Sequence, residues 1–163
     1  VIPKKMEVLQ MLQKKELVIL SHLRQDARKN LTSISKETGM PVSTIFDRIK
    51  RYEKGLIQKH TALLDFSKLG YDVKVHIALK VPKDKRESFK SYLLREPLVN
   101  SVYRINNGYD FMIEAVFRNI KEVHDFIEGL DEYKVKSAEQ HFVLEEIKRE
   151  GFMADPQLVR LMA

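Results

Sequence analysis

Residues 30–57 read NLTSISKETGMPVSTIFDRIKRYEKGLI, and this stretch decides the fold of the N-terminal third of the chain. It predicts a helix over 31–38, for which Asn30 or Thr32 is a suitable N-cap. Gly39 supplies the left-handed residue that commonly ends a helix. The span that follows this glycine is short, so we expect the chain to turn tightly before the next helix.

The next segment, from Ser43 to Lys54, predicts a helix with one buried side and one polar side. The buried stripe consists of Ile45, Ile49, Tyr52 and Leu56. The opposite side is mostly basic and consists of Thr44, Asp47, Arg48, Lys50, Arg51 and Lys54. Further upstream, Glu16 to Gln25 is apolar enough to form a buried helix. Three short helices joined by a tight, glycine-containing turn predict a helix-turn-helix.

Beyond Ile57 the apolar residues follow a period of two, which is typical of strands. The alternation predicts strands over 73–81, 101–105, 109–117 and 135–147. Helices between them are expected to start at Asp84 with Glu87 and at Asn119 with Glu122, each pair resembling a capping box. Asn107-Gly108 is a strong hairpin signal between the second and third strands. The order βαββαβ predicts a ferredoxin-like sandwich, so the fold class is α+β, with the helix-turn-helix domain first.

These patterns also predict the domain boundaries. The helix-turn-helix domain covers 1–56, and a linker strand over 57–70 leads into the ferredoxin-like domain at 71–150. An N-terminal extension, 1–13, carries a short apolar stripe for packing or dimer contact: Met6, Leu9 and Leu12. Residues 151–163 form a C-terminal tail.

One face of the predicted sheet is covered by two helices and the other is bare. Alternating apolar residues on a bare face would normally be buried against a second copy of the chain. We therefore expect a homodimer formed through these sheets, with further assembly into a tetramer or octamer.

The charge of the chain is concentrated at its N-terminal end. Residues 1–60 contain 13 Lys and Arg against 6 Asp and Glu, whereas residues 61–163 contain 16 against 17. A basic block beside a neutral one is typical of a nucleic-acid-binding module joined to a domain with another task. The alternative is an ordinary solvated helical side.

Composition excludes several other functions. The 163 residues include no cysteine, so disulfides, cysteine nucleophiles and thiolate metal sites are ruled out. No apolar run is long enough to span a membrane, and we expect a cytoplasmic protein. The five histidines show no metal-ligand spacing, and no acid-base pair can be placed beside a serine. We therefore predict no catalytic residues, no metal and no cofactor.

Two motifs resemble the Lrp/AsnC family of transcriptional regulators. ILSHLRQDAR at 19–28 resembles the first-helix signature of that family, and RIKRYEKGLI at 48–57 resembles its recognition-helix signature. The hairpin NGYDF at 107–111 resembles the Gly-x-Tyr-Asp hairpin of the sensing domain. The chain departs from the family pattern at Pro41, where a serine is frequent and where Pro41 itself or Ser43 would have to begin the helix.

The resemblance implies that the helix at 43–54 lies in the major groove of operator DNA. The implied DNA-binding residues are Arg28, Lys36, Ser43, Thr44, Asp47, Arg48, Lys50, Arg51 and Lys54. Thr44, Asp47 and Arg48 are placed for base edges, whereas the other basic residues would contact phosphates. Arg48 has two alternatives, a phosphate contact or an internal ion pair with Asp47 or Glu53.

The resemblance also implies a small-molecule effector, usually an amino acid, bound at the loop from 106 to 110. The residues concerned are Asn106, Asn107, Gly108, Tyr109 and Asp110. The Asp110 carboxylate could accept an ammonium group, and N–H groups near Gly108 could hold a carboxylate. The alternative is a simple hairpin turn in which Asp110 is an outward strand residue.

Two other functions remain open on the sequence. Sirohaem decarboxylases resemble this family in fold, and the candidate residues here would be His76, His124 or His141 with Arg104. An architectural protein would wrap DNA without an effector. The basic side of the helix at 43–54 favours a DNA-binding protein over an enzyme, which need not keep a phosphate-binding helix.

Overall fold

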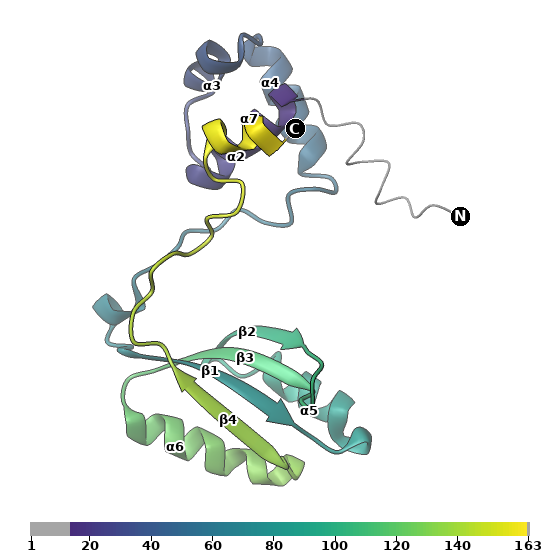
Figure 1. Ribbon diagram of the computed structural model, residues 1–163, viewed down its shortest axis with the longest axis vertical. Helices are drawn as coiled ribbons and strands as arrows, with labels where there is room; N and C mark the ends of the chain where they lie inside the picture. The colour runs from purple at the N-terminus through teal and green to yellow at the C-terminus, as the bar shows by residue number, and fades with distance from the viewer. Residues whose placement is uncertain (1–13, 163) are drawn as a thin grey trace. The chain divides into compact units, whose positions relative to one another are not determined.

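The computed structural model describes residues 14–162 and divides the chain into two compact units (Figure 1). One unit combines the residues up to 63 with those from 147 onward, and the other is formed by 64–146. The predicted N-terminal extension, with Met6, Leu9 and Leu12, lies outside the described residues.

The first unit contains the three predicted helices, which confirms the helix-turn-helix. They are α2 (Lys14–Gln25), α3 (Leu31–Thr38) and α4 (Val42–Tyr52). Their core is formed by Ile19, Ile34, Met40, Ile45 and Tyr52.

The predicted ends of α3 are confirmed. The Asn30 side chain caps this helix and accepts the Thr32 N–H at 2.8 Å. Gly39 ends it in the left-handed region with φ 67°.

The ends of α4 differ from the prediction. Pro41 occupies the N-cap position without a side-chain hydrogen bond, so Ser43 lies inside the helix and does not begin it. The helix ends at Tyr52 instead of Lys54, because the Tyr52 carbonyl accepts the N–H groups of three following residues. These are Gly55 at 3.2 Å and Leu56 and Ile57 at 2.8 Å each.

The C-terminal segment, predicted only as a tail, forms a fourth helix of this unit. Helix α7 (Pro156–Met162) packs against α2, as Figure 1 shows. Val159 is 1% exposed in this contact. The Arg24 guanidinium of α2 also donates to the carbonyls of Glu150 and Phe152, at 3.0 and 3.1 Å.

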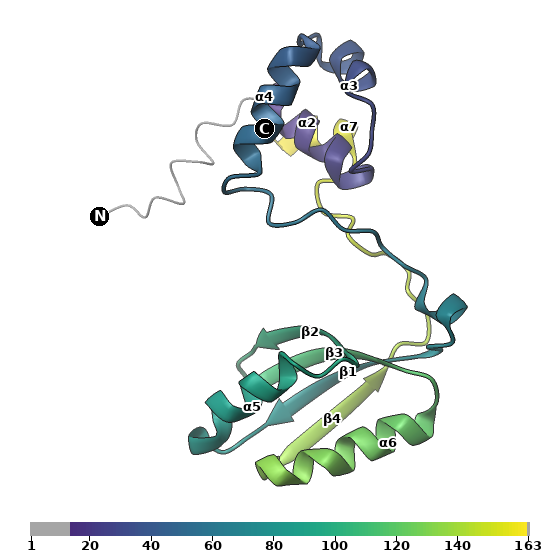
Figure 2. The same cartoon turned by 180° about the vertical axis from the view of Figure 1, so that it is seen from behind.

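The second unit is a four-stranded antiparallel sheet with the predicted ferredoxin-like topology. Its strands are β1 (Val73–Lys80), β2 (Val99–Arg104), β3 (Phe111–Phe117) and β4 (Ser137–Phe142), in the order β2-β3-β1-β4. Helices α5 (Arg86–Leu93) and α6 (Ile120–Gly129) cover one face of the sheet (Figure 2). Short 3-10 turns lie at Phe66–Leu69, Lys83–Lys85 and Leu130–Tyr133.

The helix-covered face of the sheet holds the core of this unit. Alternate residues of β1 and β3 face each other there, as in the pairs Ile77 with Ile113 and Leu79 with Phe111. Phe89 of α5 contacts Phe111 edge-on, with ring centroids 5.7 Å apart. The period of two in the sequence therefore predicts the buried side chains correctly.

The uncovered face of the sheet is more polar than expected. It carries Lys74, His76, Lys80, Ser101, Glu114, Ser137, Glu139 and His141, with Ala78, Tyr103, Met112 and Val116 as its apolar or aromatic residues. Cross-strand polar contacts, such as His76 Nε2 with the Glu114 carboxylate at 3.1 Å, connect side chains on this surface. The need to bury apolar side chains is therefore not by itself a sufficient reason to expect a dimer through this face.

Three further predictions about elements are corrected. Residues 57–70 form no strand, because none of the described strands pairs with them. The last strand ends at Phe142 and does not reach residue 147. Asp84 does not cap a helix, since it lies within the 3-10 turn that precedes α5. The Asn119 cap is confirmed, with its Oδ1 accepting the Glu122 N–H at 3.0 Å.

Candidate DNA-binding and effector-binding sites

Helix α4 presents a distinct exposed side, opposite the stripe of Ile45, Ile49 and Tyr52 that packs in the core. The exposed residues of this side are Val42, Ser43, Phe46, Asp47 and Lys50, followed by Lys54 beyond the helix end. Arg28 and Lys36, which lie outside α4, are exposed too. Arg51 is exposed as well, so seven of the nine residues predicted to bind DNA are accessible. The other two, Thr44 and Arg48, are partly buried.

The predicted DNA-reading residue Arg48 instead points back toward helix α2. Its Nη1 lies 2.7 Å from Oε1 of Glu16, a carboxylate that is 5% exposed. The ion-pair partner is thus Glu16, and the expected pairing with Asp47 or Glu53 is wrong. A sequence pattern cannot find this partner, because Glu16 lies 32 residues upstream on another helix.

The same Glu16 oxygen holds two more residues of α4. Arg51 Nη2 donates to it at 2.9 Å and the Tyr52 hydroxyl donates at 3.1 Å. Burial, and then the neighbouring Glu16 carboxylate, raise the pKa of Tyr52, so the phenol remains a donor. Glu16 therefore fixes the rotation of α4 about its own axis, which decides which side chains face outward.

Phe46 is a residue that the sequence reasoning missed. Its side chain is 50% exposed, and Lys50 Nζ lies 5.7 Å from the centre of its ring. Lys50 also contacts Glu53 at 3.3 Å, but the pair is exposed and so leaves the lysine available for an external anion. The sequence did contain a signal for an exposed Phe46: it is an apolar residue that lies outside the buried stripe, among the polar residues of the helix.

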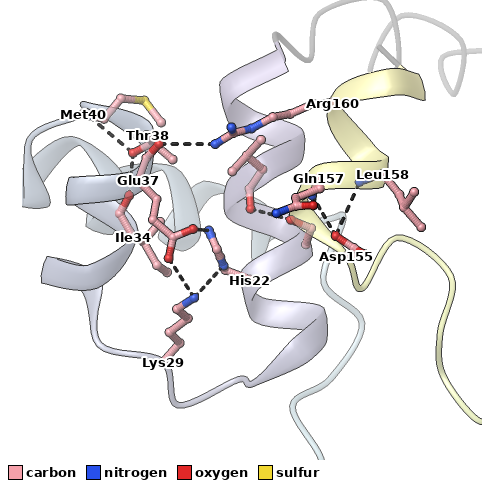
Figure 3. A network of polar contacts seen from close by, with 12 residues as sticks. His22, Lys29, Ile34, Glu37, Thr38, Met40, Asp155, Gln157, Leu158 and Arg160 are labelled. Carbon is pink, nitrogen blue, oxygen red and sulfur yellow. Dashed lines mark hydrogen bonds and ion pairs between the residues drawn. The ribbon is translucent and has the colours of Figure 1, made fainter.

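A buried histidine of α2 contacts a glutamate of α3, as Figure 3 shows. His22 is 1% exposed; its Nε2 lies 3.0 Å from Glu37, and Lys29 Nζ lies 2.8 Å from its Nδ1. Because the ammonium donates to Nδ1, the neutral ring carries its proton on Nε2. Burial and the Lys29 charge lower the pKa of His22. Arg160 of α7 donates to the Glu37 carbonyl at 3.4 Å, which ties α7 to the same network.

The predicted effector loop forms a tight hairpin turn between β2 and β3. Asn107 and Gly108 both adopt positive φ angles, 59° and 92°, which is the pattern of a type I′ turn. Asn106, Asn107 and Gly108 are exposed, and the Tyr109 hydroxyl bonds the Glu139 carboxylate. The residues of the turn thus lie at the surface, at one end of the sheet.

Asp110 lies at the base of this turn and is 5% exposed, so it is not the outward strand residue of the alternative interpretation. Its Oδ2 accepts the Val81 N–H at 3.0 Å, and its Oδ1 lies 2.6 Å from Arg86 Nη2. Both carboxylate oxygens are thus used within the chain. Arg86 Nε is buried without a hydrogen-bond partner. A cationic N–H donor therefore lies next to Asp110, at the base of the turn.

Of the histidines proposed for an enzyme, His76 and His141 are cross-strand neighbours, and His124 lies apart from them. His76 and His141 lie on the uncovered sheet face, whereas His124 is on α6, which packs on the other face. Arg104 stacks on the Phe111 ring at 4.8 Å, also on the helix-covered side. Within residues 14–162, no three histidine or acidic side chains are placed to hold a metal ion.

Among the described helices, none is both long and apolar enough to cross a membrane.

Comparison with known proteins matches both units. Residues 72–152 match the family model described as the Lrp/AsnC ligand binding domain, and residues 12–55 match a winged helix-turn-helix DNA-binding model. The uncharacterized HTH-type transcriptional regulator PH1692 of Pyrococcus horikoshii is 33% identical over 140 residues, covering 85% of this chain and 94% of the relative. HTH-type transcriptional regulator FL11 of Pyrococcus furiosus is 35% identical over 111 residues, covering 68% and 74%.

Solved structures show the same architecture. Transcriptional regulator NMB0573 of Neisseria meningitidis, solved as a complex with L-Met, superposes with a TM-score of 0.80 at 26% identity, covering 85% of this chain and 94% of that one. LrpC of Bacillus subtilis gives a TM-score of 0.76 at 25% identity, covering 85% and 97%.

A helix-turn-helix joined to a separate ferredoxin-like sandwich defines a class of transcriptional regulators that combine a DNA-binding unit with a ligand-binding one. With this fold and these relatives, the chain belongs to the Lrp/AsnC family.

Proposed function

We propose that this protein binds operator DNA through the exposed side of α4 and that an amino acid bound to the sheet unit alters this binding. The observation that carries the proposal is the outward, mostly basic side of α4, which Glu16 holds in a fixed rotation. Such a helix supplies phosphate contacts for affinity and base contacts for sequence choice.

The DNA contacts divide by accessibility. Ser43 and Asp47, near the start of α4, face base edges, and Thr44 contributes from the margin of that side. Phosphates are contacted by exposed cations, namely Arg28, Lys36, Lys50, Arg51 and Lys54. Arg48 acts as a positioning residue, because its guanidinium is directed to Glu16.

The effector is proposed to bind at the hairpin turn of 106–109. The N–H groups of this exposed turn suit a carboxylate, and the L-Met complex of NMB0573 supports an amino acid as the class of ligand. Asp110 positions the turn through Val81 and Arg86, so its role is indirect.

The proposal also includes the oligomeric state of the protein and its location in the cell. A homodimer, and from it a larger oligomer, would place a second copy next to the effector loop and pair the helix-turn-helix units for two half-sites. The proposed role is regulation and not catalysis, since His76 and His141 lie on the opposite sheet face from Arg104 and His124 is a largely exposed residue of α6. A DNA-binding regulator acts where the DNA is, in the cytoplasm.

Selection from a random duplex library, followed by a thermal-shift screen of the twenty amino acids, tests the proposal. The full chain should enrich a defined DNA sequence, and at least one amino acid should raise the melting temperature and change affinity for that sequence. Enrichment without any amino-acid response would favour an architectural role. No enrichment would contradict DNA recognition, and a Soret band on adding haem would favour the decarboxylase.

A further inference from the structure

Helix α4 carries an apolar feature inside its otherwise polar outer side. Val42, Phe46 and Lys50 follow one another at intervals of four residues and so lie in one row along the helix. Val42 is 41% exposed and Phe46 is 50% exposed, although both are apolar. The two residues fall in the first half of the helix, the part that meets base edges when a recognition helix enters the major groove.

The surroundings of the ring restrict what can cover it. Lys50 extends over the Phe46 ring, and Arg51 and Lys54 add further positive charge on neighbouring positions. A second copy docked here through the same helix would bring these like charges together, which opposes association. A polyanion that also presents an apolar group would satisfy both features, because its charges would pair with the cations and its apolar group would contact the Phe46 ring.

We propose that Phe46, with Val42 beside it, reads the C5-methyl group of a thymine in the operator. The thymine methyl is the apolar group that base edges present in the major groove, and phenylalanine is among the side chains that contact it. Lys50, held near the ring, contacts the adjacent phosphate and keeps the ring at the groove. This inference rests on the proposed DNA-binding function and adds the base that α4 selects.

Replacing thymine with deoxyuridine tests the inference, because it removes only the methyl group. The full chain first selects a duplex from a random library, and each thymine of that duplex is then replaced in turn. Wild-type protein should bind about fourfold more weakly at one or two positions, the loss expected for one buried methyl group. Phe46→Ala should bind both duplexes equally well at those positions.

Phe152→Ala is the matched control, since this phenylalanine belongs to the same unit and its side chain is 71% exposed. The control should keep the full sensitivity to the methyl group. Wild-type protein that ignores every thymine methyl, or Phe46→Ala that retains the sensitivity, would overturn the inference.

Two other results distinguish a failure of this inference from a failure of the proposed DNA-binding function. A chain that selects no duplex overturns the proposed function and this inference with it. A chain that selects a duplex without sensing methyl groups leaves the proposed function standing and overturns only the role of Phe46. If Phe46→Ala instead lowers the molecular mass in light scattering and leaves methyl sensitivity intact, the ring belongs to a protein contact and the inference is wrong.

Discussion

Glu16 is the residue on which the orientation of α4 depends. Its carboxylate is nearly buried and is shared by two guanidinium groups and a hydroxyl, from Arg48, Arg51 and Tyr52. Removing one partner of a buried ion pair leaves the other charge without compensation, which costs more than the pair itself contributes. The residue therefore matters for the site although it is on a different helix and far from the exposed side.

We expect Glu16→Ala to lower the free energy of unfolding by about 3 kcal/mol, because Arg48 loses its partner while remaining mostly covered. Arg51→Ala is the matched control: it removes the exposed member of the cluster, 66% accessible, and should cost less than about 1 kcal/mol. Urea unfolding of both variants measures the difference. Equal costs would show that Glu16 does not hold α4 through Arg48.

His22 makes the helix-turn-helix unit sensitive to acid. Its pKa is lowered from 6.5 in the folded chain by burial and by Lys29, so the unfolded chain binds the proton more readily. Stability is therefore complete above pH 6.5 and decreases as the pH falls toward the lowered value. Glu37 titrates in a separate window, since its pKa is lowered from 4.5, chiefly by the hydrogen bond from Lys29.

Thermal unfolding at a series of pH values checks this expectation with His22→Gln, which cannot titrate. Between about pH 7 and pH 5 the melting temperature of the wild type should fall relative to that of the variant. His124→Gln, at an exposed position on α6, is the control and should follow the wild type. A wild-type curve parallel to that of His22→Gln would contradict the effect.

At the scale of elements, α7 extends the small core of the helix-turn-helix. Three short helices bury little apolar surface, and a unit of this size is therefore only marginally stable. A fourth helix packed on α2 enlarges the buried surface and stabilises the unit. Adjacent residues of α7 provide a direct comparison, because Val159 is 1% exposed and Leu158 is 58% exposed.

Val159→Ala should cost about 2 kcal/mol, and Leu158→Ala should change stability little. Hydrogen exchange of the α2 amides in the full chain is the measurement, since these amides report on the contact itself. We expect faster exchange only in Val159→Ala. Equal protection in both variants would mean that α7 does not support α2.

Most elements could be predicted because their signals are local. The alternation in β1, the Asn107-Gly108 turn, the Asn30 and Asn119 caps and the Gly39 end each depend on a few neighbouring residues. The errors involve distant partners. Residues 57–70 were expected to form a strand, but none of the described strands pairs with them, and α7 owes its place to contacts with α2.

The candidate sites follow the same rule. The basic side of α4 could be predicted from its helical period, but the direction of Arg48 could not, because Glu16 is 32 residues away. The hairpin turn at 106–109 was recognisable, whereas the burial of Asp110 depends on Val81 and Arg86, which come from a different part of the chain. Individual side-chain roles therefore required the tertiary contacts.

At the scale of the whole molecule, charge separates the two units. The unit formed by 1–63 and 147–163 contains 16 Lys and Arg against 8 Asp and Glu, whereas 64–146 contains 13 against 15. Attraction to DNA therefore acts on the helix-turn-helix unit and leaves the sheet unit free for ligand and partner contacts. The return of the chain at 147 adds three cations and two acidic residues to the helix-turn-helix unit.

The salt dependence of DNA binding tests the central claim, that the exposed side of α4 lies on the duplex. Affinity for the selected duplex is measured by fluorescence anisotropy over a range of salt concentrations for wild type, Lys50→Ala and Lys68→Ala. Lys68 is an 82% exposed lysine of the sheet unit and serves as the control. Lys50→Ala should weaken binding to every sequence by a similar factor and flatten the slope of log affinity against log salt by about 0.9, with Lys68→Ala unchanged. An unchanged slope for Lys50→Ala, or an equal change for both variants, would contradict the placement of α4 on DNA.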